Sequence, residues 1–233
     1  MRGARKVSIL WPTVRPETCA GGIAYWLSKA NKPQHVSVKV ACSYSQHKET
    51  LLLTLQKLCA NAFPLEVIVA IFDSPGVTKP FYELTRPLEM DQEDIVVLAS
   101  DDFKPPDFWD AWASHHFDDF DGCLLVNDGY QTGTCVTIPI MTFGCLCRLN
   151  KTTYHPIYSH AYSDSELYDV LQEMKLLRNL RIPSQPVFEH VHWAVQKRVP
   201  DEWDERVKRS FFEDQALYEK RKNLPLAEKL KVC

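Results

Sequence analysis

The sequence predicts an α/β fold with a mostly parallel sheet flanked by helices, in a single domain. Short apolar runs rich in Val and Ile alternate with longer segments in which apolar residues recur at helical spacing. This alternation repeats through the first half of the chain, where right-handed crossovers would make successive strands parallel. The 233 residues, of which 45% are hydrophobic, also suffice to bury an ordinary core without disulfides or a structural metal.

Seven segments are predicted as strands, because they are short, apolar and rich in β-branched residues. They are Lys6–Leu10, Val36–Ser43, Glu66–Phe72, Asp94–Ala99, Gly122–Asn127, Cys135–Pro139 with a continuation to Leu149, and Pro186–Trp193. Helical spacing predicts helices near Thr18–Lys29, His47–Ala62, Pro80–Leu84 and Asp107–His116.

The second half of the chain differs in character, since a loop rich in Thr, Tyr, His and Ser follows Asn150. A strong apolar stripe then predicts a helix from Asp164 to Leu180. The last segment, Asp201 to Lys222, is predicted as a helix that docks on the domain. Its helical spacing is carried by Trp203, Val207, Phe211 and Ala216. We therefore expect one domain over residues 1–195 and a C-terminal helical segment over residues 196–233.

Charge and cysteine usage exclude several classes of protein. A formal net charge of -3 argues against broad, non-specific attraction to nucleic acid or anionic membranes. Eight cysteines without a signal-peptide-like segment indicate reduced thiols, and Cys145 and Cys147 are expected to be buried on one face of a strand. No run approaches the length of a membrane span. We therefore expect a soluble, cytoplasmic protein, in the host cytoplasm if its source is viral.

The most informative segment is the apolar run that ends in Ser100, Asp101 and Asp102. Ligands of α/β sheets bind at the carboxyl ends of strands. Carboxylates at that position can hold a hard divalent ion, which keeps several waters and takes its remaining ligands from substrate phosphates. The alternative is that both Asp residues are turn and cap residues before a Pro-Pro pair.

Two histidines, His190 and His192, stand two residues apart and would share one face of an extended segment. Imidazole readily completes sites for ions such as Mn²⁺. An isolated pair of this kind would instead be packed or hydrogen-bonded at the end of a strand. Its combination with the two Asp residues favours a metal site.

A third feature is Ser163-Asp164-Ser165-Glu166, immediately before the predicted helix. Ser163 and Glu166 have the spacing of a capping box, and Asp164 would complement the helix dipole. A carboxylate in the first turn of a helix that faces a cleft could also take a proton from an acceptor hydroxyl. Both interpretations remain open on the sequence.

In this order, the segments resemble the inverting family-2 glycosyltransferases of the GT-A fold. Residues 7–13 followed by Arg15-Pro16 are similar to the family's first strand and loop, and Ser100-Asp101-Asp102 to its DXD-type metal motif. Residues 163–167 resemble the segment that carries the catalytic base. The resemblance covers roughly residues 6–195, with a nucleotide-binding half over about 6–105 and an acceptor half over about 106–195.

The resemblance implies a role for each matched residue. Asp164 would be the catalytic base, and Tyr162 and Glu166 would lie toward the acceptor. The metal ligands would be Asp102 with His190 or His192. The donor-binding set would be Pro12, Thr13, Arg15, Ser43, Lys79, Ser100 and Asp101.

The sequence also departs from the family pattern. The second strand ends in Ser43-Tyr44, where the family places an Asp on the uracil ring. Lys79 stands in place of an Arg, and Ser163 in place of a Glu. These departures bear mainly on recognition of the donor base.

The resulting prediction is a metal-dependent inverting glycosyltransferase that uses Mn²⁺ or Mg²⁺ and a nucleotide-diphosphate sugar, with a UDP-sugar favoured. The acceptor would be a polysaccharide, a glycolipid or a hydroxymethylated base in DNA. A flipped-out base could stack on the aromatic loop at residues 154–162. The alternatives are a nucleotidyltransferase of related fold and a non-catalytic module that binds a nucleotide or a sugar.

Overall fold

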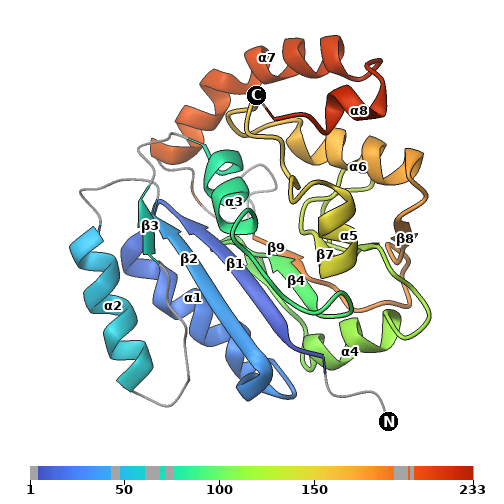
Figure 1. The fold of residues 1–233 in the computed structure, drawn as a ribbon. Helices are drawn as coiled ribbons and strands as arrows, with labels where there is room; N and C mark the ends of the chain where they lie inside the picture. The colour runs from blue at the N-terminus through green and yellow to red at the C-terminus, as the bar shows by residue number, and fades with distance from the viewer. Residues whose placement is uncertain are drawn as a thin grey trace.

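The computed structural model describes residues 5–42, 48–60, 69–71, 76–191, 199 and 202–232. Its centre is a seven-stranded sheet of order β3-β2-β1-β4-β7-β6-β8 (Figure 1). The strands are β1 (Val7–Thr13), β2 (Val36–Cys42), β3 (Val69–Ile71), β4 (Ile95–Leu98), β6 (Cys123–Leu125), β7 (Ile140–Thr142) and β8 (Leu177–Asn179). β7 is antiparallel to its neighbours β4 and β6, whereas the other pairings are parallel. The predicted α/β class with a mostly parallel sheet is confirmed.

The sheet is buried on both faces by helices. Ile9 and Trp11 of β1 pack into one apolar cluster, whereas Leu10 between them packs into the other, as the alternation of side chains along a strand requires. The first cluster includes residues of α1 (Pro16–Ser28), α2 (Lys48–Ala60) and α4 (Trp109–His116). The second includes residues of α3 (Thr78–Thr85), α5 (Phe143–Arg148) and α6 (Ser163–Glu173). This double covering agrees with the burial of every residue of β1 and β4.

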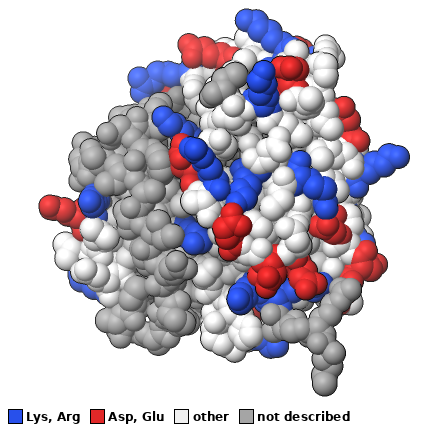
Figure 2. Space-filling view, viewed as in Figure 1, with Lys and Arg blue, Asp and Glu red and all other residues white. Residues whose placement is uncertain are grey.

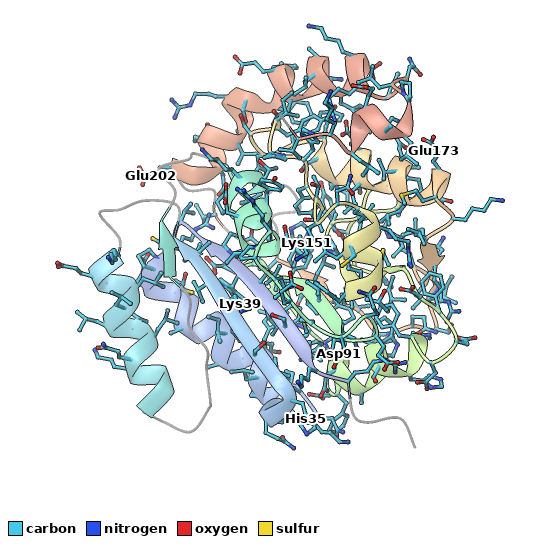
Figure 3. The ribbon with its side chains drawn as sticks, viewed as in Figure 1. His35, Lys39, Asp91, Lys151, Glu173 and Glu202 are labelled. Atoms are coloured by element: carbon cyan, nitrogen blue, oxygen red, sulfur yellow. The ribbon has the colours of Figure 1, made fainter. Side chains whose placement is uncertain are left out.

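A second, two-stranded sheet and two C-terminal helices complete the fold. A small antiparallel sheet joins β5 (Phe103–Lys104) to β9 (Glu189–His190). The helix α7 (Glu202–Arg221) and the short α8 (Leu226–Lys229) cross the top of the molecule (Figure 1). Figure 3 shows Glu202, at the start of α7, beside the end of the sheet where β1 and β2 finish, and His35 and Asp91 at the opposite end. The start of α7 therefore lies near the carboxyl ends of β1 and β2.

α7 docks through polar residues. The predicted helix is present, but Phe211 and Ala216 of the predicted stripe are exposed. Its buried positions include Asp204, Asp214 and Arg221. The helical spacing of the apolar residues therefore predicted the helix correctly but not the face that it buries.

The chain from Cys135 to Leu149 contains one strand and one helix, where the sequence predicted continuous strand. The hydroxyl of Thr142 accepts a hydrogen bond from the backbone N–H of Cys145 and caps the start of α5. Cys145 and Cys147 are therefore on a helix. Cys145 is buried, as predicted, whereas Cys147 is partly exposed.

The predicted helix from Asp164 to Leu180 ends at Glu173. Lys175 adopts a left-handed backbone conformation with φ 57°. Around it, the N–H of Leu176 bonds to the carbonyl of Leu171 and the N–H of Lys175 to that of Gln172, which is a Schellman termination. The chain then continues into β8. Glycine usually marks this turn, and its absence here removed the signal.

No helix within the described residues is long and apolar enough to cross a bilayer.

Candidate functional site

The carboxyl ends of β1 and β4 lie side by side because the two strands are parallel neighbours. Asp101 follows β4, and its carboxylate accepts hydrogen bonds from Trp11 Nε1 at 2.9 Å and Thr13 Oγ1 at 3.4 Å. Burial raises the pKa of Asp101 to about 7, and the neighbouring carboxylate of Asp102 adds to the effect. The predicted donor residues Thr13 and Asp101 are therefore in contact. A cation bound beside Asp101 and Asp102 would offset the repulsion between their carboxylates.

Arg15 supplies positive charge at the same point. Its backbone N–H donates to Thr13 Oγ1 at 3.0 Å, which orders the loop after β1. Its guanidinium is partly buried and lies 3.9 Å from a carboxylate oxygen of Asp204, on α7. The charge of Arg15 also lowers the pKa of Asp101, against the larger effect of burial. Arg15 is thus placed beside the carboxylates at the end of β4.

Asp102 is partly exposed, and its backbone carbonyl accepts a hydrogen bond from the N–H of Val191 at 2.7 Å. The imidazole of His160 lies within electrostatic range of the carboxylates of Asp102, Asp204 and Asp214. Burial lowers the pKa of His160, and the carboxylates oppose that change. His160 was not among the predicted site residues, although it lies in the aromatic loop at residues 154–162.

His190, which was predicted as a metal ligand, contacts Phe103 and lies near the carboxylate of Asp128. Its ring stacks on Phe103 at 4.2 Å, and Nδ1 lies 3.8 Å from the carboxylate of Asp128. Asp128 is fully buried and accepts hydrogen bonds from the backbone N–H groups of Tyr130 and Gln131 and from the hydroxyl of Thr137. Burial alone would raise the pKa of Asp128, but its hydrogen bonds lower that pKa to about 2. The carboxylate of Asp128 beside His190 is therefore ionised at neutral pH.

Asp164 occupies the first turn of α6, as predicted. Burial raises its pKa, while His190 lowers it and Asp128 raises it, so the three groups are electrostatic neighbours. The side chain is only partly buried, and Oδ1 accepts a hydrogen bond from the N–H of Ser165 at 2.9 Å. A carboxyl group that retains some solvent access but has a raised pKa is suited to accept a proton.

The predicted capping box is wrong. Tyr162, with a left-handed φ of 61°, is the N-cap residue of α6 and makes no side-chain cap. Ser163 is the first helical residue, and its hydroxyl donates to the carbonyl of His160 at 3.0 Å. Glu166 does not reach back to the cap, because its carboxylate binds Arg221.

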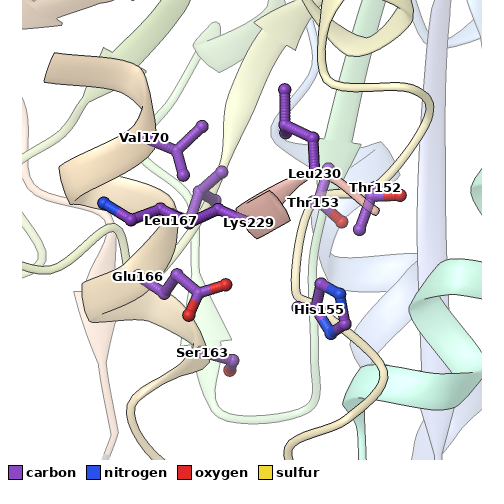
Figure 4. A pocket seen from close by; sticks show the side chains of 9 residues that line it. All are labelled: Thr152, Thr153, His155, Ser163, Glu166, Leu167, Val170, Lys229 and Leu230. Atoms are coloured by element: carbon purple, nitrogen blue, oxygen red, sulfur yellow. The ribbon is translucent and has the colours of Figure 1, made fainter. Parts of the chain in front are cut away.

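The carboxylate of Glu166, which was predicted to lie toward the acceptor, is bound by side chains inside the protein. Glu166 is 3% exposed, and its carboxylate forms a bidentate pair with Arg221 at 2.8 and 2.9 Å and accepts a hydrogen bond from the Tyr158 hydroxyl at 2.6 Å. These donors use its acceptor capacity inside the protein. Figure 4 shows Glu166 and Ser163 of α6 on one side of a small pocket, with His155 across from them. This pocket contains none of Asp101, Asp102 and Asp164.

Tyr162 packs on α7, with ring centroids 5.3 Å from Phe211 and 5.4 Å from Tyr218. It remains partly exposed, next to Asp164 in sequence.

Other predicted residues are less closely placed. Pro12 is buried within β1, Ser100 is partly exposed in the turn after β4, and Lys79 is exposed on α3. Ser43 and His192 lie outside the described residues. Among the residues that the structure describes, no three His, Cys, Asp or Glu side chains are close enough to hold a metal ion.

Charges are mixed over the face shown in Figure 2, where Lys and Arg side chains alternate with Asp and Glu. This agrees with the near balance of acidic and basic residues in the sequence.

Comparison with known proteins gives a clear result for the fold. No protein-family model matches the sequence, and no curated protein does. Among solved structures, the mannosyltransferase PcManGT from Pyrobaculum calidifontis, in complex with GDP-Man and Mn²⁺, is 16% identical with a TM-score of 0.65, over 97% of this chain and 68% of that one. Residues 1–349 of TarS from S. aureus, in complex with UDP-GlcNAc, are 17% identical with a TM-score of 0.62, over 96% and 69%.

A third similar structure is glucosyl-3-phosphoglycerate synthase from Mycobacterium tuberculosis, in complex with Mn²⁺, UDP and glucosyl-3-phosphoglycerate. It is 13% identical with a TM-score of 0.61, over 95% of this chain and 81% of that one. The chain therefore shares the fold of these three structures, and the predicted GT-A-like fold is confirmed.

Proposed function

We propose that the protein is a metal-dependent inverting glycosyltransferase that moves a sugar from a nucleoside diphosphate to an acceptor hydroxyl. One observation carries the proposal. On a fold shared with enzymes that bind nucleotide sugars, the carboxylates of Asp101 and Asp102 lie at the carboxyl end of β4, beside Thr13 and Arg15. This is the edge of an α/β sheet at which ligands bind.

The donor side of the proposed site contains Thr13, Arg15, Ser100 and Asp101. The guanidinium of Arg15 suits an oxygen-rich diphosphate, because its fork of N–H donors matches phosphate geometry. The hydroxyl of Thr13 already accepts the Arg15 N–H and touches Asp101, so these groups would move together. Pro12 and the exposed Lys79 remain on the donor side as predicted.

A divalent ion, Mn²⁺ or Mg²⁺, would be held by Asp102. One partly exposed carboxylate fits such an ion, which keeps several waters and takes other ligands from substrate phosphates. When bound, the ion would neutralise the negative charge that develops on the departing diphosphate. His190 faces Asp128, so we assign it to the surroundings of Asp164 rather than to the ion. His192 stays a predicted ligand outside the described residues.

Asp164 would act as the general base. Its raised pKa increases its affinity for a proton relative to an ordinary Asp. The acceptor oxygen would attack the anomeric carbon from the side opposite the diphosphate. The new C–O bond forms as the bond to the diphosphate breaks, and the acceptor proton passes to Asp164. Configuration at the anomeric carbon is thereby inverted.

A calorimetric titration with UDP, GDP and TDP, with and without Mn²⁺, tests the donor site. Wild type should bind one diphosphate in a Mn²⁺-dependent manner, with a UDP preference, and Asp102→Ala should lose the metal-dependent part. Absence of binding for every nucleotide under both conditions would contradict the proposal.

The base is tested with Asp164→Asn. We expect at least a hundredfold loss of UDP release from a UDP-sugar, with unchanged affinity for UDP. Glu173→Gln, at the exposed end of the same helix, is the matched control and should keep wild-type turnover. Equal turnover in both variants would remove Asp164 from the mechanism. Donor binding without any turnover in wild type would instead favour a non-catalytic binding module.

The proposed acceptor is a glycan hydroxyl. The mixed charges in Figure 2 give no support on that face for a polyanion such as DNA, since phosphate backbones are bound mainly by clustered Lys and Arg. A hydroxymethylated DNA base is therefore the second acceptor to test.

A further inference from the structure

The buried carboxylate of Asp214 on α7 holds three consecutive backbone N–H groups of one turn. Oδ1 accepts from Ser159 at 2.9 Å, and Oδ2 accepts from His160 and Ala161, each at 2.9 Å. Asp214 is 3% exposed. Hydrogen bonds to an ionised acceptor are stronger than neutral ones, and burial strengthens them further. One side chain thus orders the whole turn, which we call the 158–161 turn.

The opposite side of the 158–161 turn is fixed by the loop before α3. The hydroxyl of Thr78 donates to the carbonyl of Tyr158. Gly76 lies so close that a Cβ atom at this position would sit 1.6 Å from the carbonyl oxygen of Ser159. The 158–161 turn is therefore held by Gly76 and Thr78 on one side and by Asp214 of α7 on the other.

The 158–161 turn carries His160 and leads into the start of α6, where Asp164 lies. His160 lies within electrostatic range of Asp102 and Arg15, and its carbonyl accepts the Ser163 hydroxyl at the start of α6. Asp164 follows directly in the first turn of α6. A displacement of the turn would move an imidazole at the metal side and the proposed base together.

We propose that Asp214 is a positioning residue that sets the acceptor side of the site by fixing the 158–161 turn. It touches no reacting atom and acts through the three N–H groups. The proposal deepens the proposed function and rests on it for its effect on turnover. Its physical part, the fixing of the turn, is independent of any activity.

The test compares wild type with Asp214→Asn, Asp214→Ala and the control Asp169→Asn. The amide group of Asn is isosteric with the carboxylate, but it places an N–H₂ group opposite a backbone donor and removes the charge. Asp169, on α6, accepts the hydroxyl of Tyr218 on α7 at 2.7 Å, so its variant also weakens the α6–α7 contact without touching the turn. The substrates are UDP-GlcNAc and GDP-mannose with Mn²⁺ and water as acceptor.

Three readouts are measured: kcat and KM for nucleotide release, amide hydrogen exchange at residues 159–161, and the NMR signals of the His160 ring. In Asp214→Asn we expect kcat to fall about 10- to 100-fold with KM within about twofold, because small displacements of reacting groups are costly. The three amides should exchange faster and the His160 signals should shift. Asp169→Asn should leave kcat, KM, the exchange of the three amides and the His160 signals unchanged, even if its melting temperature falls by as much as that of Asp214→Asn.

A kcat within twofold of wild type in Asp214→Asn, or unchanged exchange at the three amides, would overturn the proposal. An equal fall of kcat in Asp169→Asn would also do so, since it would trace the effect to general loosening of α7. If wild type neither binds nor cleaves a nucleotide sugar, the proposed function fails. The exchange and His160 signals then decide by themselves whether Asp214 holds the turn.

Discussion

Arg221→Ala should be among the most destabilising single substitutions on α7. Arg221 is 8% exposed and donates to both carboxylate oxygens of Glu166 and, through Nη2, to the carbonyl of Lys229 at 3.0 Å. Its removal leaves the buried carboxylate of Glu166 with the hydrogen bond that the Tyr158 hydroxyl donates. Removing one partner of a buried pair costs about 3–5 kcal/mol, because the other charge stays buried and uncompensated.

In a chain of this length, such a loss corresponds to a fall of about 10 °C in melting temperature. The control is Lys222→Ala, one position further, because Lys222 pairs with Glu219 at the surface. Exposed pairs of this kind are worth about 0–1 kcal/mol. Thermal and urea unfolding of both variants measure the difference. The double variant Glu166→Gln with Arg221→Met should recover part of the stability lost in Arg221→Ala, since no isolated charge remains. Equal, small losses in both single variants would show that the pair is not buried in solution.

Two further predictions concern packing and pH. Gly76→Ala should lower the melting temperature by about 5 °C or more, because its Cβ cannot avoid the backbone of Ser159, whereas Gly21→Ala in α1 meets nothing within 4 Å and should be neutral or stabilising. Equal melting temperatures would refute the close approach. Without a cation, the carboxyl group of Asp101 has a pKa of about 7 in the folded chain and 3.8 in the unfolded chain. Between these two pH values the folded chain binds more protons than the unfolded chain. The free energy of unfolding should therefore fall as the pH rises from about 3.8 to about 7. Asp101→Asn should remove this fall, and identical pH profiles of unfolding for wild type and variant would count against the raised pKa.

The first four strands and the carboxylates after β4 could be predicted because their signals are local. A run of apolar residues that stops at Ser100-Asp101-Asp102 predicts a buried strand with polar residues at its carboxyl end. The start of α6 near Asp164 was predicted for the same reason. The fold class followed from the order of such segments, and the similar solved structures confirm it.

The partners of side chains could not be predicted, because they depend on residues far away in the sequence. His190 meets Asp128 only after β9 pairs with β5, and Glu166 meets Arg221 only after α7 docks. The stretch around Asp214 reads as the solvated face of a charged helix. Nothing in the sequence distinguishes its buried carboxylate from the exposed Glu213 beside it.

The polar docking of α7 has a consequence that an apolar stripe would not have. Apolar contacts tolerate small sliding, whereas the hydrogen bonds of Asp214 and Arg221 are satisfied only at one axial position of the helix. Because these residues lie two turns apart and bind the 158–161 turn and α6 separately, they also fix the distance between those two segments. Asp164 stands where the segments join. Arg221→Ala should therefore reduce turnover beyond what its loss of folded protein explains, and its kcat per folded molecule, measured well below the melting temperature, would show it.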